Sequence, residues 1–361
     1  MKLKNIFFLR SFLLPLLPLL LLLPLTLPLT TRASEPALTS IYNHRPDLQK
    51  AFNKTTGLAV PNSAAGYLID LEDWAKQYGW QEYGELASFA PTSEKLPRQV
   101  GPAVVPEVTA SSYIVVDKNS GLVLKEKNSS TVWPIASITK LMTTKLVLDS
   151  GADLNEICDV EAGDDVGGAK LYVSSGATFS LNDLIYATLV GSANNAANAI
   201  TRATGLDKIS FVQKMNQTAK ACGLPHTIYT DPTGIDPSNV STAREIAKLA
   251  GQVFARSDFR QYTQTATRTI SVLSSGETKK LTNTNWLLWK PAYDDIYVMA
   301  GKTGYLEESN WNLVTALRPT LNDSTREVIV VVFGSASRGD SANDAKALAE
   351  WTWNNFVWEE K

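Results

Sequence analysis

The sequence predicts an α+β fold, in which an antiparallel sheet is flanked by helices and accompanied by a helical subdomain. Three observations predict it. A β-hairpin pattern occupies residues 111–128, helical patterns fill residues 137–255, and β runs between residues 267 and 335 precede a last helical pattern. The simplest packing joins the early hairpin to the late strands in one sheet, with the last helix on one of its faces.

The elements follow in order from local patterns. Two short β runs surround the turn "NSG" in the hairpin. Apolar residues at helical spacing follow from Ser137. Ser180 is a good N-cap with Asp183 three residues later, and Ser241 is expected to cap a later helix that has Glu245 in its first turn. The β runs after residue 265 alternate with turns such as "SSGE" and "LNDS".

Composition excludes several classes of protein. The 361 residues are 44% hydrophobic, enough for a sizeable core, and carry a net charge of −2. Such a chain has no strong basic field to attract nucleic acid. No cluster of residues has metal-ligand spacing, so we expect neither a metal nor another cofactor. Cys158 and Cys222 are compatible with one disulfide or with two free thiols.

Residues 1–33 indicate export. A basic start with Lys2, Lys4 and Arg10 precedes a long Leu/Pro run, and Ala33 provides a small residue at a cleavage point. This pattern predicts a cleaved signal peptide, with an uncleaved N-terminal membrane anchor as the alternative. Prolines in the run favour the signal because they interrupt a regular helix. Either reading places the bulk of the protein outside the cytoplasmic membrane.

The rest of the chain is expected to have two parts. Residues 34–106 combine short helical patterns with a proline-rich stretch, which predicts an accessory arm and a linker. Residues 107–361 have the texture of a compact domain.

The stretch "SITK", residues 137–140, suggests nucleophilic chemistry. Residues three apart on a helix share a face, so the amine of Lys140 can reach the hydroxyl of Ser137. To act as a base, this lysine must be neutral, which requires burial and nearby positive charge. A Ser-His-Asp triad is unnecessary, because Lys140 already supplies a base for Ser137. The two histidines, His44 and His226, are better explained as arm and loop residues.

Two further stretches are weak alone and strong in combination. Ser192 and Asn194 lie at a helix boundary, where a hydroxyl and a carboxamide can relay a proton and bind an amide. The stretch "KTGY", residues 302–305, ends a β run along which an extended peptide can pair. The order Ser-x-x-Lys, Ser-x-Asn and Lys-Thr-Gly matches the signature of penicillin-binding proteins and class A β-lactamases.

Residues 107–355 accordingly resemble the low-molecular-mass penicillin-binding proteins, which are serine D-Ala-D-Ala carboxypeptidases and D-Ala endopeptidases. The hairpin and "SITK", the stretch "TDPTGIDPSNVSTAREIAKLA", and the later "NTNWLLW" and "VMAGKTGY" all carry the resemblance. It implies a β-lactamase/transpeptidase-like fold, peptidoglycan stem peptides as substrates, and β-lactams as covalent inhibitors. It also implies an extracytoplasmic location in a bacterium, in the periplasm, the cell wall or at the outer face of the cytoplasmic membrane.

The resemblance also implies roles for individual residues. Ser137 would be the acylated nucleophile, Lys140 its base and Ser192 a proton carrier. Substrate binding would fall to a second group: Asn194, Lys302, Thr303, Gly304, Tyr305 and Arg338. Among these, Arg338 would bind a terminal carboxylate, and the backbone N–H groups of Ser137 and Tyr305 would form the oxyanion hole.

The exact reaction stays open at this point. The stretches "NVSTAREIAKLA" and "NTNWLL" look nearer to the endopeptidase branch. Carboxypeptidases of the family often carry a second β domain and an amphipathic C-terminal anchor, for which the residues after the last helix leave no room. A serine β-lactamase or an esterase-like acyl hydrolase is one alternative, although no Glu-x-x-Leu-Asn stretch lies between the second and third motifs. A non-catalytic wall-binding protein is another.

Overall fold

The computed structural model describes residues 96–101 and 104–358. The predicted signal or anchor and nearly all of the predicted arm lie outside the described residues. Among the described residues, no helix combines the length and the apolar composition that crossing a bilayer requires.

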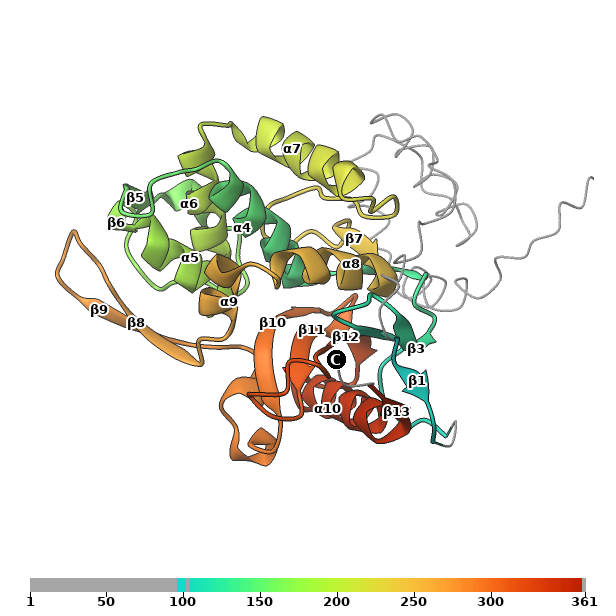
Figure 1. Cartoon of the computed structure of the whole chain (residues 1–361). Coiled ribbons are helices and arrows are strands. Elements are labelled where there is room, and N and C mark those ends of the chain that lie inside the picture. Colours follow the sequence, from blue (N-terminus) through green and yellow to red (C-terminus); the bar gives the residue numbers. More distant parts are fainter. Residues whose placement is uncertain (1–95, 102–103, 359–361) are drawn as a thin grey trace, which may run out of the picture. The chain divides into compact units, whose positions relative to one another are not determined.

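The centre of the fold is a five-stranded antiparallel sheet with the strand order β10-β11-β12-β2-β3. The sheet confirms the predicted α+β class, because the early hairpin pairs with β12 and so shares one sheet with three of the late strands (Figure 1). Its strands are β2 (Ser112–Asp117), β3 (Val123–Lys127), β10 (Tyr297–Leu306), β11 (Asn310–Arg318) and β12 (Val328–Ser335). Strand β10 lies at one edge, where no strand within the described ranges pairs with its outer side.

Helices cover both faces of this sheet. The α-helices are α4 (Lys140–Asp149), α5 (Leu181–Leu189), α6 (Asn194–Thr201), α7 (Lys208–Ala221), α8 (Ala243–Val253), α9 (Ser257–Thr263) and α10 (Arg338–Asn355). Figure 1 shows α8 and α10 on opposite sides of the sheet. Successive residues of β2 face opposite sides, so Ile114 and Val116 pack in the core beneath α8, whereas Val115 packs with α10.

The late strands β8 (Thr267–Ser271) and β9 (Thr278–Thr282) correct one expectation. They form a separate two-stranded hairpin rather than joining the main sheet. Each strand buries one residue, Ile270 in β8 and Leu281 in β9, which is too little apolar surface to cover a sheet face.

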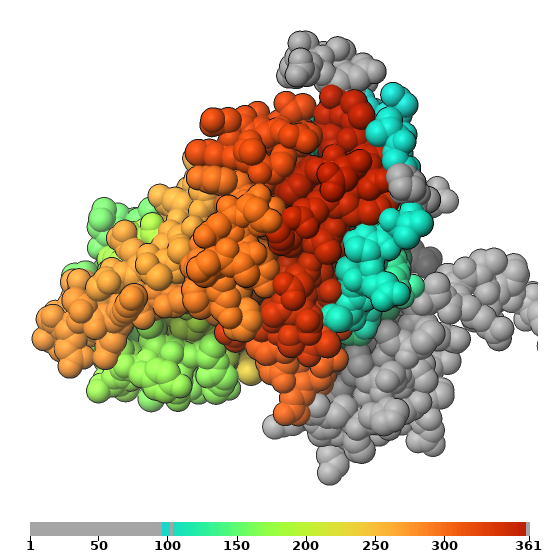
Figure 2. All heavy atoms as spheres, turned by 90° about the horizontal axis from the view of Figure 1, so that it is seen from below, coloured from blue at the N-terminus to red at the C-terminus, as the bar shows by residue number. Residues whose placement is uncertain are grey.

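Three further two-stranded ladders complete the fold. They pair β1 (Arg98–Gln99) with β13 (Phe356–Val357), β4 (Val132–Pro134) with β7 (Val240–Thr242), and β5 (Ile157–Val160) with β6 (Ala177–Ser180). The first ladder holds the end of the predicted linker against the terminal helix, where the Val104 carbonyl accepts a hydrogen bond of 2.7 Å from Trp351 Nε1. Figure 2 shows this first described segment, in cyan, lying along the red C-terminal residues.

Helix caps and cysteines complete the comparison with the sequence. Ser180 Oγ accepts from Asp183 N, which confirms that cap. The cap of α8 is Thr242 instead of Ser241, because the helix begins at Ala243 and the Ser241 hydroxyl bonds to Thr227 inside the core. Cys158 and Cys222 are both free thiols.

Candidate active site

Ser137 and Lys140 lie on the same side of one helical segment. The segment begins as the 3-10 helix η1 (Ala136–Thr139) and continues as α4, so Pro134 precedes its start as the sequence suggests. Lys140 Nζ lies 2.8 Å from Ser137 Oγ, within hydrogen-bond distance. This is the contact that a lysine base requires.

The amine of Lys140 is buried in a polar cage. It also donates to Asn194 Oδ1 at 2.7 Å and to the Thr233 carbonyl at 2.6 Å. Its side chain has no solvent exposure. Burial lowers the pKa of Lys140 from 10.5 to about 7, because the charged amine loses its hydration, and the negative charge of Asp231 partly opposes this effect.

Ser192 and Lys302 form a second pair beside the first. Lys302 Nζ donates to Ser192 Oγ at 2.8 Å and to the Thr303 carbonyl at 2.9 Å. Ser192 has a φ of 57°, a left-handed conformation that non-glycine residues adopt at an energetic cost. Burial first, and then the charges of Lys140 and Arg338, lower the pKa of Lys302 well below its ordinary value. The sequence led us to expect that a neighbouring positive charge lowers the pKa of Lys140. In the structure this effect falls on Lys302, whose pKa is lowered by the charge of Lys140.

A glycine allows β10 to reach the nucleophile. A Cβ at Gly304 would lie 2.6 Å from the Ile135 carbonyl oxygen and 3.3 Å from Ser137 N. Because β10 passes this close to η1, the third motif is brought beside the first. The sequence reasoning assigned this freedom to the approach of substrate, and the structure shows that the chain itself also needs it.

These groups open into a cleft of about 380 Å³. Most of the residues predicted for the site line it: Ser137, Ser192, Asn194, Thr303, Gly304, Tyr305 and Arg338. Lys140 and Lys302 are fully or almost fully buried and do not line the cleft; they touch it through the hydroxyls of Ser137 and Ser192. The structure thus brings the whole predicted set together.

Arg338 occupies an aromatic setting at one end of the cleft. Its guanidinium carbon lies 4.7 Å from the ring centroid of Trp311 and 5.8 Å from that of Trp286. Trp311 in turn stacks on Tyr305 with the centroids 4.2 Å apart. The buried Nε of Arg338 has no hydrogen-bond partner among the described residues. A cation held this way is available to an anionic group that enters the cleft.

Sequence reasoning found the turn after residue 230 but missed its contact with Lys140. Asp231 Oδ1 accepts from the backbone N–H groups of Thr233 and Gly234, and this turn presents the Thr233 carbonyl to Lys140. Gly234 has a φ of 78°, and a Cβ there would overlap the Ala136 carbonyl. The pattern Asp-Pro-Thr-Gly predicts a turn, but no side-chain motif marks a backbone acceptor.

Comparison with known proteins fits this geometry. A family model described as D-alanyl-D-alanine carboxypeptidase matches residues 99–337. The chain is 32% identical over 268 residues to a D-alanyl-D-alanine endopeptidase of Pseudomonas aeruginosa, covering 74% of this chain and 84% of that protein. It is 28% identical over 283 residues to the D-alanyl-D-alanine carboxypeptidase DacA of Haemophilus influenzae, covering 75% and 68%.

The fold also resembles a solved structure. A mutant of a Streptomyces DD-transpeptidase superposes with a TM-score of 0.62 and 26% identity, covering 69% of this chain and 99% of that one. This structural likeness agrees with the five-stranded sheet and its flanking helices. The chain therefore belongs to the D-alanyl-D-alanine carboxypeptidase family of peptidases and is a hydrolase.

Proposed function

We propose that this protein cleaves D-alanyl bonds of peptidoglycan stem peptides through an acyl intermediate on Ser137, and that β-lactams acylate the same hydroxyl. The observation that carries the proposal is the 2.8 Å contact between Lys140 Nζ and Ser137 Oγ. With its pKa lowered to about 7, Lys140 is neutral in about half of the molecules at neutral pH and is able to accept the serine proton.

In the proposed acylation step, Ser137, Lys140 and Ser192 each have a defined role. As Ser137 Oγ bonds to the D-Ala carbonyl carbon, its proton passes to Lys140 Nζ. The carbonyl oxygen becomes an oxyanion that the backbone N–H groups of Ser137 and Tyr305 stabilise, each worth about 2.7–4 kcal/mol. Ser192 passes a proton to the leaving amine as the C–N bond breaks. Water then hydrolyses the ester and releases Ser137.

Substrate binding is assigned to the other cleft residues. An extended stem peptide pairs along the open edge of β10, with Asn194 and Thr303 binding its polar groups. A carboxylate beyond the cleaved bond binds Arg338, whose position between Trp311 and Trp286 leaves it without a competing ion pair among the described residues.

We favour cleavage of crosslinks over trimming of terminal D-Ala. The endopeptidase of Pseudomonas aeruginosa is 32% identical to this chain and the carboxypeptidase of Haemophilus influenzae 28%. Carboxypeptidase activity is the second candidate, and it is supported by the carboxylate-binding position of Arg338. For either reaction, we place the domain outside the cytoplasmic membrane, where peptidoglycan lies, on the strength of the basic and then apolar residues at 1–33.

Mass spectrometry of penicillin-treated protein tests the acyl intermediate. Wild type is expected to gain one covalent adduct, and Ser137→Ala none. Ser150→Ala is the matched control, since Ser150 directly follows α4 and its hydroxyl donates to the Val147 carbonyl, away from the cleft. An adduct that persists in Ser137→Ala would refute the assignment. Rapid turnover of the penicillin would favour a β-lactamase, and absence of both adduct and hydrolysis would favour a wall-binding protein.

A further inference from the structure

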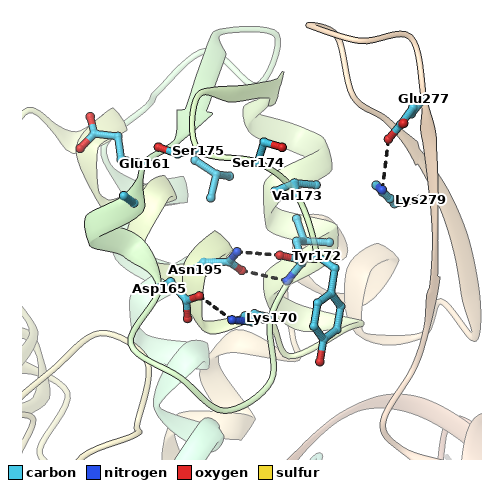
Figure 3. Close-up of a pocket in the computed structure, with 13 residues that line it drawn as sticks. Glu161, Asp165, Lys170, Tyr172, Val173, Ser174, Ser175, Asn195, Glu277 and Lys279 are labelled. Atoms are coloured by element: carbon cyan, nitrogen blue, oxygen red, sulfur yellow. Dashed lines mark hydrogen bonds and ion pairs between the residues drawn. The ribbon is translucent and has the colours of Figure 1, made fainter.

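A second, larger cavity lies beside the cleft and has no part in the mechanism above. Its volume is about 560 Å³. One wall is the loop that contains Lys170, Tyr172 and Ser174, and the other is the β8–β9 hairpin, with Glu277 just before β9 and Lys279 within it. Figure 3 shows Glu277 and Lys279 on the β8–β9 ribbon, across from Val173 and Ser174.

The two cavities share a wall that is one chain thick. Ala169 lines the cleft, and the next residue, Lys170, lines the second cavity. Likewise, Asn194 lines the cleft and Asn195 lines the second cavity. Consecutive Cα atoms are about 3.8 Å apart, so a molecule that occupies both cavities has only to cross this loop.

Hydrogen bonds hold the shared wall in place. Asn195 Oδ1 accepts from Leu171 N and Asn195 Nδ2 donates to the Leu171 carbonyl, both at 2.9 Å. Asn194 N donates to the Ala169 carbonyl at 2.7 Å. A further hydrogen bond ties the β8–β9 hairpin to the other side: Leu273, after β8, donates its backbone N–H to the Thr178 carbonyl of β6 at 2.8 Å. The second cavity is therefore a fixed feature of the domain.

The lining carries charges of both signs in weak pairs. Lys170 pairs with Asp165 at 2.5 Å, and Lys279 pairs with Glu277 at 3.2 Å. All four side chains are 32–66% exposed, and ion pairs at such exposure contribute little to stability. A ligand with both an ammonium and a carboxylate group can replace these pairs at small cost.

We propose that the second cavity binds the other peptide branch of a crosslinked substrate while the first branch acylates Ser137. This inference rests on the proposed function. A crosslinked substrate has two peptides joined at the bond that is cut, so one branch leaves the cleft on the far side of that bond. Stem peptides carry free carboxylates and amines, the two groups that Lys170, Lys279, Asp165 and Glu277 complement. The exposed ring of Tyr172 at the rim offers a surface for the peptide backbone.

Charge reversal on β9 tests the proposal. Lys279→Glu changes a side chain that faces the cavity, and Lys280→Glu makes the same change on the opposite face of the same strand. The substrates are a sugar-free crosslinked peptide dimer and the corresponding monomeric pentapeptide. The ratio of kcat/KM for dimer over monomer is expected to fall about three- to tenfold in Lys279→Glu, through KM, and to stay at the wild-type value in Lys280→Glu.

Each outcome decides one question. An unchanged ratio in Lys279→Glu, or equal falls in both variants, overturns the second-branch site. If the ratio falls only when a sugar-bearing dimer replaces the sugar-free one, the cavity would be assigned to the glycan strand and the peptide assignment overturned. Penicillin labelling of each variant verifies its folding. The proposed function fails separately, if wild-type protein hydrolyses neither substrate in a way that depends on Ser137.

Discussion

The rate at which penicillin acylates Ser137 should rise about tenfold between pH 6 and pH 8 and then level off. The structure supplies the magnitude, since burial lowers the pKa of Lys140 to about 7. The neutral fraction of such an amine is about 0.09 at pH 6 and about 0.91 at pH 8. An amine with the ordinary value of 10.5 would instead gain about a hundredfold over this interval and keep rising beyond pH 9.

Stopped-flow measurement of acylation by a fluorescent penicillin, from pH 5 to pH 10, gives the profile. A rate still climbing tenfold per pH unit above pH 9, or a flat profile from pH 5, would refute a buried lysine base. Lys140 and Lys302 lie close enough to titrate as a pair, so the observed midpoint belongs to both.

The variant Asp231→Asn assigns the midpoint to Lys140. The Asp231 charge raises the pKa of Lys140, so its removal should move the rising limb to lower pH. The limb would stay in place if Lys302 controlled the profile, because Asp231 is not among the groups that shift its pKa. Thermal melting verifies that the altered turn remains folded.

Three further variants test the packing around the site. Lys140→Met removes a titrating group, so the stability of the wild type relative to this variant should rise by about 3.5 kcal/mol from pH 7 to pH 10, because over this range the unfolded chain holds the Lys140 proton more tightly than the folded chain does; urea denaturation at both pH values measures the difference. Gly304→Ala places a methyl group against the Ile135 carbonyl, so it should cost about 1–3 kcal/mol and slow penicillin acylation; a wild-type rate would contradict the close approach of β10. Glu327→Gln removes a buried charge that pairs with two arginines and should cost about 3 kcal/mol in urea denaturation, with acylation unchanged.

The order of elements was predictable because each carries its own local pattern. The turn "NSG" and the flanking β runs defined the β2–β3 hairpin, and Ser180 defined the start of α5. The β8–β9 hairpin was misplaced because alternation along a strand does not say which sheet the strand joins. Ser241 and Thr242 are both good caps, and only the tertiary bond from Ser241 to Thr227 decides between them.

The site was predictable where motif residues carry side-chain chemistry. The spacing of Ser137, Lys140, Ser192 and Lys302 indicated that four side chains would meet, and the structure places them in two hydrogen-bonded pairs. Their roles stay predictions until the variants are measured. The contact between the Thr233 carbonyl and Lys140 could not be predicted from the sequence, because every residue has a carbonyl and only the folded turn brings this one to the amine.

The pairing of Gln99 with Phe356 brings the first and last strands of the described domain together. Paired Cα atoms in such a ladder lie about 5 Å apart, which is the width of a gap that a surface loop of another protein can bridge. The peptidase unit therefore suits insertion into a host scaffold, or circular permutation through a short artificial linker, without disturbing the strand that carries Lys302.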